Sequence, residues 1–466
     1  MNRFTFFLPG VVAVAFCFGA RARAQGASPT AALLAELIRV DTSNPPGNEG
    51  RIDDLLAAKL RPLGFQIDII PTPVAGKSVL FARLKGDGSA RPVLIAAHGD
   101  VVGVEREKWT VDPFAGVMKD GYVYGRGAID FKGGMAVFAQ AVMSLARNKV
   151  PLKRDVIFLV ESDEESATYN TTWLAQSQWD KMDCEFALNE GGWIMTKPNG
   201  QVRYVSVSTN DKSSTSIVLT ARGTSTHSSM PLPDNAIFTL ARALTKLGDY
   251  ETKVELTPST RQFFNTLAQT SDGPMKKYFS DLLDGTDPAK VAAADRAISQ
   301  DPLLHAIMRN TIAPVMINGG FRGNVIPGSA TATVNFRTIP GTTPEDLIAL
   351  VKKVIDDPHV EVTTPASNGA RPKDSPTDTA LYAALVASAN KLWPGVPVTP
   401  YLFQAGTDAA PWRSRGVPVY GIYPYPISNE DLRRMHGNDE RVLIKSLDEG
   451  TTLIYDTLVT VAGRQP

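Results

Sequence analysis

Cysteine and histidine are scarce in this sequence, with two cysteines and five histidines in 466 residues. Cys17 lies in an N-terminal apolar run that we expect to be removed, so Cys184 would be the single cysteine of the remaining chain. A single cysteine excludes an intrachain disulfide. The stability of the protein must therefore come from a buried core, from bound metal or from a partner subunit.

An excess of charge of one sign is also lacking, since 48 basic residues balance 48 acidic ones. Removing the three arginines of residues 1–24 leaves 45 basic residues against 48 acidic ones. Such a chain offers no strongly basic surface to nucleic acid or to an anionic membrane, and we expect neither as a partner.

The N-terminus has the form of a cleavable secretory signal. Residues 1–3 are a short basic start, residues 4–20 are apolar, and Ala22-Arg23-Ala24 has the small-x-small form of a signal-peptidase site. Pro9 and the polar stretch after the apolar run favour cleavage over a membrane anchor. We expect residues 1–24 to be removed and the mature protein to be periplasmic or secreted.

The chain is too long for one hydrophobic core, so two or more domains are expected. Strands alternate with helices up to about residue 210 and again from about residue 370, which is typical of an α/β domain with a largely parallel sheet. Between these parts the expected order is β-α-β-β-α-β, as in a ferredoxin-like α+β module. We predict a large domain formed by 25–212 and 367–466, and a smaller domain at 213–366 that carries a mostly helical insertion at about 250–312.

The segment from Val93 to Asp100 is the first that suggests chemistry. Val93–Ala97 has the small and branched apolar residues of a strand buried on both faces, and His98, Gly99 and Asp100 follow it. The carboxyl ends of such strands are where α/β proteins bind ligands. His98 and Asp100 would point the same way on extended backbone, which suits an imidazole that binds a metal and is held by a carboxylate. A histidine at a strand end is more often only hydrogen-bonded, so this segment alone does not establish a metal site.

Four further stretches carry metal-ligand residue types at strand ends or in loops: Asp130, the Glu164-Glu165 pair, Glu190 and His436. Histidine and carboxylate ligands together suit zinc, or a neighbouring divalent ion such as cobalt or manganese. Each residue also has an ordinary structural interpretation, as a helix cap, a solvated acidic turn, a turn residue or an exposed loop residue. Turn chemistry does not explain why three apolar strands all end in ligand types, so we predict a metal site.

Five motifs, in order along nearly all of the expected mature chain, carry a resemblance to a known family. They are Ala97-His98-Gly99-Asp100, Gly125-Arg126-Gly127-Ala128-Ile129-Asp130, Asp163-Glu164-Glu165, Asn189-Glu190-Gly191-Gly192 and Met435-His436-Gly437. They resemble the aminoacylase/carboxypeptidase family of dinuclear-zinc metallopeptidases, which includes glutamate carboxypeptidase, succinyl-diaminopimelate desuccinylase and carboxypeptidase S. Trp109, Pro113-Phe114 and Gly116 are most similar to the carboxypeptidase S branch. The resemblance implies an α/β, mostly parallel-sheet catalytic domain with an inserted ferredoxin-like lid or dimerisation domain.

The same resemblance implies two zinc ions per chain, with cobalt or manganese as substitutes. Asp130 would bridge the two ions, His98 and Glu190 would complete one site, and Glu165 and His436 would complete the other. Asp100 would hold His98, and Glu164 would be the general base. Two cations that share a carboxylate lower the pKa of a bridging water, and a nearby carboxylate that binds neither can accept its proton and return it to the leaving amine.

The smaller domain has candidates of its own. Gly223–Pro231 resembles the family's lid histidine segment, which implies that His227 stabilises the oxyanion, and in dimeric members this histidine comes from the other subunit. Asn324 and Arg337 resemble the family's grips on the substrate carboxylate, and Gly406-Thr407-Asp408 resembles its carboxylate-binding loop. Without the resemblance, an exposed strand charge explains Arg337 equally well.

We therefore predict an exported dinuclear-metal hydrolase that cleaves an amide or peptide bond next to a free carboxylate. Its substrates would be small peptides or N-acyl amino acids, and it would form a homodimer through the lid or act as a monomer. One alternative is an aminopeptidase or dipeptidase acting from the free N-terminus, which an acidic pocket for an ammonium group would favour. Another is a periplasmic peptide-binding protein, which would not need a base beside a bridged metal pair.

Overall fold

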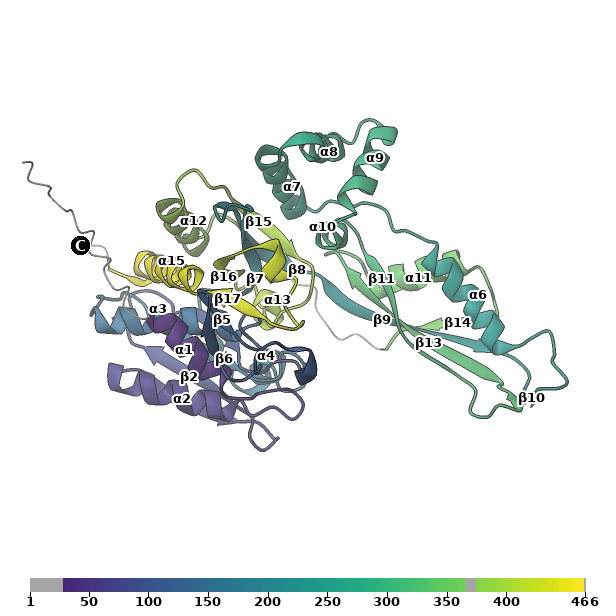
Figure 1. Cartoon of the computed structure of the whole chain (residues 1–466), viewed down its shortest axis with the longest axis horizontal. Helices are drawn as coiled ribbons and strands as arrows, with labels where there is room; N and C mark the ends of the chain where they lie inside the picture. Colours follow the sequence, from purple (N-terminus) through teal and green to yellow (C-terminus); the bar gives the residue numbers. More distant parts are fainter. Residues whose placement is uncertain (1–27, 366–373, 465–466) are drawn as a thin grey trace, which may run out of the picture.

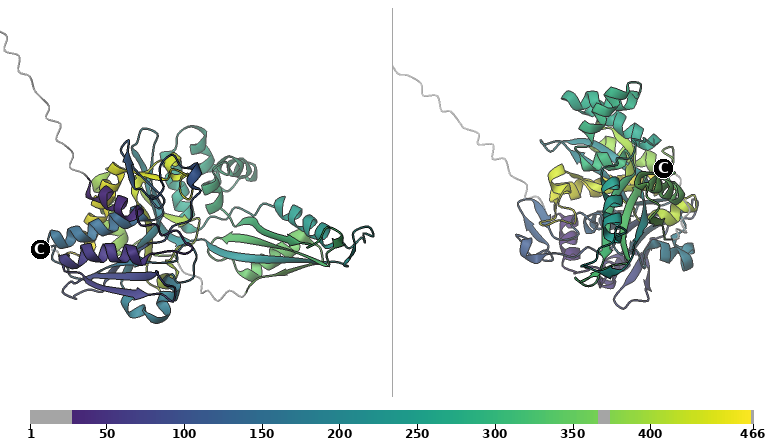
Figure 2. Two further views of the ribbon diagram at one scale, coloured as in Figure 1. Left: turned by 60° about the horizontal axis from the view of Figure 1, so that its bottom comes forward. Right: turned by 90° about the vertical axis from the view of Figure 1, so that its right-hand side faces the viewer.

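The chain forms a large domain and a lid that projects from it (Figures 1 and 2). The computed structural model describes residues 28–365 and 374–464, so the predicted signal peptide at 1–24 lies outside the described residues. Within these ranges, no helix combines the length and the apolar character needed to cross a bilayer. The large domain is built from two separate parts of the chain, as the alternation of strands and helices predicted.

An eight-stranded sheet forms the centre of the large domain. In order across the sheet, its strands are β1 (Gln66–Pro71), β2 (Ser78–Leu84), β6 (Val156–Glu161), β3 (Val93–His98), β7 (Phe186–Thr196), β16 (Val419–Ile427), β8 (Val202–Asp211) and β15 (Val398–Phe403). The central strands β6, β3, β7 and β16 are parallel, and antiparallel pairings occur toward both edges. The carboxyl ends of the parallel strands therefore meet at one edge of the sheet.

Side chains of the central strands alternate between two cores. In β3, Val93, Ile95 and Ala97 pack in one core, whereas Leu94 and Ala96 pack in the other. The first core is covered by α1 (Pro29–Ile38), α2 (Gly50–Leu60), α3 (Lys132–Arg147), α12 (Ala380–Leu392) and α15 (Ile444–Ala462). The second is covered by α4 (Thr171–Ser177), α5 (Trp179–Met182) and α13 (Ala410–Ser414). Burial on both faces explains why these strands are continuous apolar runs.

The lid is a four-stranded antiparallel sheet with its own core. Its strands, in order across the sheet, are β11 (Thr311–Gly319), β13 (Ser329–Thr338), β9 (Ser213–Arg222) and β14 (Val360–Thr363). Helices α6 (Ala236–Gly248) and α11 (Pro344–Ile355) bury apolar side chains against this sheet. Along the chain these elements have the predicted β-α-β-β-α-β order. A short pair, β10 (Thr226–His227) and β12 (Val325–Ile326), lies at the end of the lid away from the large domain (Figure 1).

The helical insertion packs against the large domain, whereas we had predicted it as part of the smaller domain. It comprises α7 (Pro258–Thr270), α8 (Gly273–Asp284), α9 (Pro288–Ile298) and α10 (Pro302–Ile307). The Phe263 ring centroid lies 5.5 Å from that of Tyr204 on β8 and 5.0 Å from that of Tyr401 on β15. This aromatic contact places the insertion above the β8 and β15 edge of the large sheet (Figure 1).

A small sheet and a short helix lie next in the chain to loops that carry site residues. A three-stranded antiparallel sheet contains β17 (Arg441–Leu443), β5 (Tyr122–Tyr124) and β4 (Val117–Lys119). The short helix α14 (Asn429–Leu432) precedes the loop that carries His436.

Candidate active site

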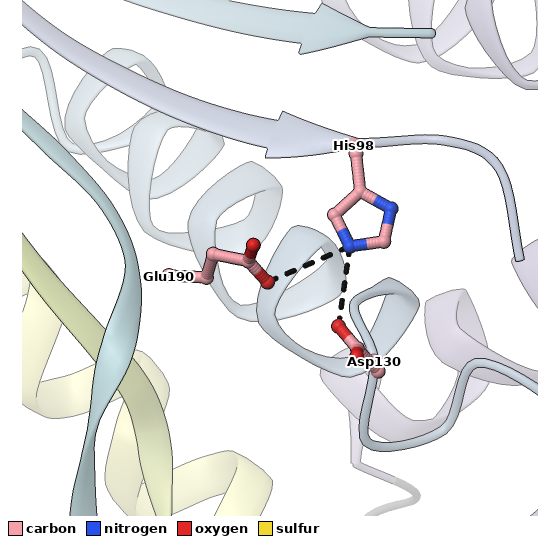
Figure 3. Close-up of side chains that lie close together, drawn as sticks. All are labelled: His98, Asp130 and Glu190. Carbon is pink, nitrogen blue, oxygen red and sulfur yellow. Dashed lines mark hydrogen bonds and ion pairs between the residues drawn. The ribbon is translucent and has the colours of Figure 1, made fainter. Parts of the chain in front are cut away.

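His98, Asp130 and Glu190 come together where the parallel strands end (Figure 3). His98 is the last residue of β3, Asp130 precedes α3, and Glu190 lies on β7. His98 Nε2 lies 3.2 Å from Asp130 Oδ1 and 3.5 Å from Glu190 Oε2. One ligand atom from each residue lies within 4.8 Å of the others, which is close enough for a shared metal ion.

A second group contains Asp130, Glu165 and His436. His436 Nε2 lies 3.1 Å from Asp130 Oδ2 and 3.2 Å from Glu165 Oε1. These ligand atoms also lie within 4.8 Å of one another. Asp130 directs one oxygen to each group, so a single carboxylate could serve two ions.

Local backbone features place two of these side chains. The pairing of β7 with β16 shifts between Asn189 and Gly192, so Glu190 sits in an irregularity within a long strand and not after a strand end as predicted. His436 has a φ of 58°, a left-handed backbone conformation that residues other than glycine rarely adopt. Such a residue persists only when its surroundings hold it.

Asp100 makes more contacts than the sequence suggested. Its carboxylate Oδ1 lies 3.4 Å from His98 Nδ1, and its own carbonyl oxygen is nearer to that nitrogen, at 3.0 Å. The backbone N–H groups of Glu164 and Glu165 donate to its two carboxylate oxygens, at 3.2 Å each. Asp100 thereby holds the His98 ring and the Glu164-Glu165 loop in one arrangement.

The carboxyl groups of the site have strongly altered pKa values because they are crowded and shielded from water. Burial, together with the charge of Asp130, raises the pKa of Glu190 to about 7. Burial and the charges of Glu190 and Asp408 raise the pKa of Glu164 well above its usual range. Burial opposes ionisation of Asp130 as well, but hydrogen bonds to His436 and His98 lower its pKa well below its usual range.

These residues fit a pair of divalent cations. Buried carboxylates in such proximity need positive charge, and imidazole with carboxylate is a donor set typical of zinc sites. The contacts of its Nε2 with the Asp130 and Glu165 carboxylates raise the pKa of His436 to about 10. The contact between His436 Nε2 and the buried Glu165 Oε1, at 3.2 Å, does not have the geometry of a hydrogen bond. Metal ions would provide the missing partner for this oxygen and release both imidazoles as neutral ligands.

A third group of acids in the described chain does not need a metal. Glu49, Asp100 and Asp163 offer oxygens within 4.8 Å of one another. The Lys77 ammonium is ion-paired with Asp163 and donates to Asn44 Oδ1 at 2.9 Å. A buried side-chain cation therefore already serves this cluster.

Sequence reasoning missed the buried pair of Arg126 and Glu440, which holds the ligand-bearing backbone. Glu440 Oε1 accepts hydrogen bonds from the N–H groups of Ile129 (2.7 Å) and Asp130 (3.1 Å). Its Oε2 lies 2.6 Å from Arg126 Nη1, and Arg126 also donates to the carbonyl of His436 at 3.3 Å. Arg126 stands in the Gly125–Asp130 motif and Glu440 follows Met435-His436-Gly437 by three residues, so charged residues in or next to these motifs were an available signal.

Tyr423 was missed as well, and the sequence offers no signal for it. Its hydroxyl lies 3.0 Å from Asp130 Oδ1 and 3.0 Å from Glu190 Oε2. The Trp193 ring stacks on the Tyr423 ring with centroids 4.2 Å apart. An aromatic wall thus backs the first metal-ligand group.

Arg337 and the Gly406-Thr407 loop come together at the junction of lid and large domain. A Cβ placed on Gly406 would lie 3.9 Å from Arg337 Nη1. The Thr407 hydroxyl donates to Asp211 Oδ2 at 2.5 Å, so it is engaged in holding the loop. These contacts leave the Arg337 guanidinium and the Gly406 backbone side by side.

Asn324 and His227 lie far from this junction. His227 is exposed on β10 and pairs across β12 with Val325, next to Asn324, at the distal end of the lid (Figure 1). Arg337 is near the opposite end of β13, about 25 Å away at the usual rise per residue. Within one chain the length of the lid strands separates Asn324 from Arg337, and that both residues hold the substrate carboxylate stays a prediction.

Comparisons with known proteins agree with this geometry. Residues 94–460 match the model of peptidase family M20/M25/M40. The chain is 31% identical over 390 residues to a probable carboxypeptidase S-like protein 2 of Dictyostelium discoideum, covering 82% of this chain and 74% of that protein. It is 30% identical over 389 residues to the human N-fatty-acyl-amino acid synthase/hydrolase PM20D1, covering 82% and 76%.

The fold is also similar to that of solved structures from this family. The M20 family metallo-carboxypeptidase Sso-CP2 from Sulfolobus solfataricus superimposes with a TM-score of 0.70 at 19% identity, covering 93% of this chain and 99% of that one. Peptidases of this family are dinuclear metal enzymes, and the two ligand groups that share Asp130 provide sites for two ions. The chain belongs to peptidase family M20/M25/M40 and is an enzyme of the metallopeptidase and amidohydrolase type.

Proposed function

We propose that this enzyme hydrolyses an amide bond next to a free carboxylate, in short peptides or in N-acyl amino acids. The observation that carries the proposal is the pairing of two features. Asp130 directs its two oxygens to two histidine-carboxylate groups, and Arg337 lies against Gly406 at the junction of lid and large domain. A guanidinium at this place suits a substrate carboxylate, which it can hold through two hydrogen bonds.

Glu164 is the proposed general base. It belongs to neither ligand group, and its backbone is fixed by Asp100 next to Glu165. A pair of divalent cations bound here, with zinc as the proposed metal, would acidify a water and polarise the scissile carbonyl. Glu164 would then take a proton onto its carboxylate and deliver it to the departing nitrogen. Its raised pKa is compatible with holding that proton between the two transfers.

A panel of substrates tests the direction of cleavage. We expect turnover of N-acetyl amino acids and of free dipeptides, and loss of turnover when the carboxylate is amidated. Arg337→Gln should raise KM for the free acids by about tenfold to a hundredfold, since it removes a charge-assisted pair. Rapid cleavage of amidated substrates that requires a free amino group would instead establish the aminopeptidase or dipeptidase alternative.

We also propose that two chains pair through their lids. In the described part of the chain, most exposed large apolar side chains lie on the lid: Met230, Leu232, Ile237, Phe238, Val315, Met316, Ile317 and Phe321. β11 is at one edge of the lid sheet, so its outer backbone groups are open to pairing. Within one copy, His227 and Asn324 lie far from the metal-ligand groups. Pairing would bring these two residues toward the metal-ligand groups of the other copy.

Complementation between two inactive variants tests this pairing. Glu164→Gln keeps His227, and His227→Ala keeps Glu164, so a mixed dimer would have one complete site. Co-expressed variants should recover about a quarter of wild-type activity by random assortment, while each variant alone stays inactive. Ile317→Lys should give a monomer in light scattering and abolish the recovery. Full activity of a monomeric Ile317→Lys protein would contradict the proposal.

Export is the remaining part of the proposed function. The short basic start, the apolar run and the small-x-small site of residues 1–24 support it. N-terminal sequencing of the protein recovered from the periplasmic fraction should begin close to Gln25. Recovery of the full-length chain only from the cytoplasm would contradict export.

A further inference from the structure

We propose that the cavity between the helical insertion and the large sheet binds a single-chain anionic amphiphile, with its alkyl chain inside and its carboxylate head at the rim. The cavity has a volume of about 820 Å³, within the range of ligand sites for small organic molecules. It is lined by α7, α8, α9 and α10 of the insertion, by the β7–β8 hairpin and by α14. None of the proposed metal ligands, Glu164 or Arg337 lines it. The proposal therefore stands apart from the proposed function.

Apolar side chains from separate elements remain only partly covered in this cavity. Met275 of α8, Leu303 and Leu304 of α10, and Leu432 of α14 all line it and are half-buried. They lie beside the fully buried Leu267 and Phe279 of the insertion. An alkyl chain would remove this partly wet surface from water, at about 25 cal/mol for each Å² covered.

Three cationic side chains line the cavity. Lys197 and Arg433 are exposed and Arg203 is half-buried, and all three line the cavity. Two acids are also present, but Asp301 accepts hydrogen bonds from the N–H groups of Leu303 and Leu304 at the start of α10. Asp272 is exposed at the start of α8. The lining thus has three cations against two acids, and its guanidinium groups suit a carboxylate head.

The cavity is formed before a ligand arrives, because aromatic contacts fix the insertion. Phe263 packs on Tyr204 and Tyr401 of the sheet, and Phe264 stacks on Phe279 with ring centroids 5.6 Å apart. A cavity with rigid walls does not have to be opened by its ligand, which lowers the free-energy cost of binding.

Two walls of the cavity are shared with the metal centre. Trp193 lines the cavity and stacks on Tyr423, whose hydroxyl contacts Asp130 and Glu190. Leu432 and Arg433 line it just before the loop that carries His436. A ligand in the cavity would therefore contact the supports of both ligand groups.

Dodecanoate binding to the mature Glu164→Gln protein, which lacks residues 1–24, tests the proposal without turnover. Calorimetry should give one saturable site, and Met275→Trp, which places a larger ring in the cavity, should weaken binding at least tenfold. Met118→Trp is the matched control, because Met118 is 47% exposed on β4 and does not line the cavity, and its affinity should not change. Dodecyltrimethylammonium should bind more weakly, and Arg433→Glu should weaken dodecanoate by about twofold to fivefold.

Two results would contradict the proposal, and inhibition kinetics would identify the ligand. Absence of saturable binding, or equal affinity of the Met275→Trp and Met118→Trp proteins, would overturn the proposal. Leu303→Trp replaces Met275→Trp if the latter does not fold by circular dichroism. In the active enzyme, competitive inhibition of N-acetyl amino acid hydrolysis by dodecanoate would identify the occupant as the acyl chain of a substrate or product. Inhibition or activation that is not competitive would identify it as a separate ligand.

Discussion

Replacement of Glu440 by glutamine should both destabilise the enzyme and weaken metal binding, although Glu440 touches no metal ligand side chain. The Glu440 side chain is fully buried, and its two oxygens accept from the N–H groups of Gly127, Ile129 and Asp130 and from Arg126. Burial raises the pKa of this carboxyl, and the pairing with Arg126 opposes that rise. An amide in its place puts an NH2 group against either Arg126 or two backbone N–H groups, so donors face donors.

The loss of stability in Glu440→Gln can be estimated from the burial of Arg126, which loses its carboxylate partner. Arg126 is 2% exposed, and a buried arginine without its carboxylate costs about 3–5 kcal/mol. Replacing a group that holds metal ligands in place by hydrogen bonds typically weakens metal binding by about 10-fold to 100-fold. Because Glu440 holds the Asp130 backbone and Arg126 holds the His436 carbonyl, both metal positions should weaken together.

The assay combines thermal unfolding of the metal-free protein with competitive zinc titration against a chromophoric chelator. Glu430→Gln is the matched control, since the Glu430 side chain is 73% exposed and pairs with Arg434 at 3.2 Å and Arg441 at 3.3 Å. Exposed pairs contribute at most about 1 kcal/mol, and this variant should keep wild-type zinc affinity. If Glu440→Gln behaves like Glu430→Gln in both measurements, the role assigned to the buried pair is wrong.

Three further predictions concern other groups. Glu164→Gln should lower kcat by about 10²- to 10⁴-fold while the bound metal, measured by mass spectrometry, stays at the wild-type ratio; loss of metal would reassign Glu164 as a ligand. Burial raises the pKa of Asp53 well above its usual range, so its contribution to stability is fully present below the unfolded-state pKa of about 4 and is lost as the pH rises through the folded-state pKa. Asp53→Asn, which can still accept from Ser78, should therefore raise Tm relative to wild type at pH 8 more than at pH 4, and an equal shift at both would refute the raised pKa. Burial also raises the pKa of the Cys184 thiol, so iodoacetamide should modify it only after unfolding, and fast labelling of the native protein would contradict this.

Much of the fold and the ligand types could be predicted because their signals are local in the chain. The apolar run Val93–Ala97 ends in His98, and parallel strands bring their carboxyl ends to one edge, so neighbouring strand ends imply convergence. The change from strand–helix alternation to β-α-β-β-α-β order marks the lid for the same reason. The motifs around Asp130, Glu165, Glu190 and His436 added the family, which the comparisons confirm.

Tertiary structure alone decided the features that depend on distance between remote segments. Strand length separates Asn324 from Arg337, and aromatic packing of Phe263 on Tyr204 assigns the insertion to the large domain. Neither hydrophobic period nor motif spacing contains that information, since both describe only neighbours along the chain. The contact of Glu440 with the Asp130 backbone joins residues 310 positions apart, and the hydroxyl of Tyr423 reaches Asp130 across 293. Such pairs form only when whole elements pack, so they were accessible only from the folded structure.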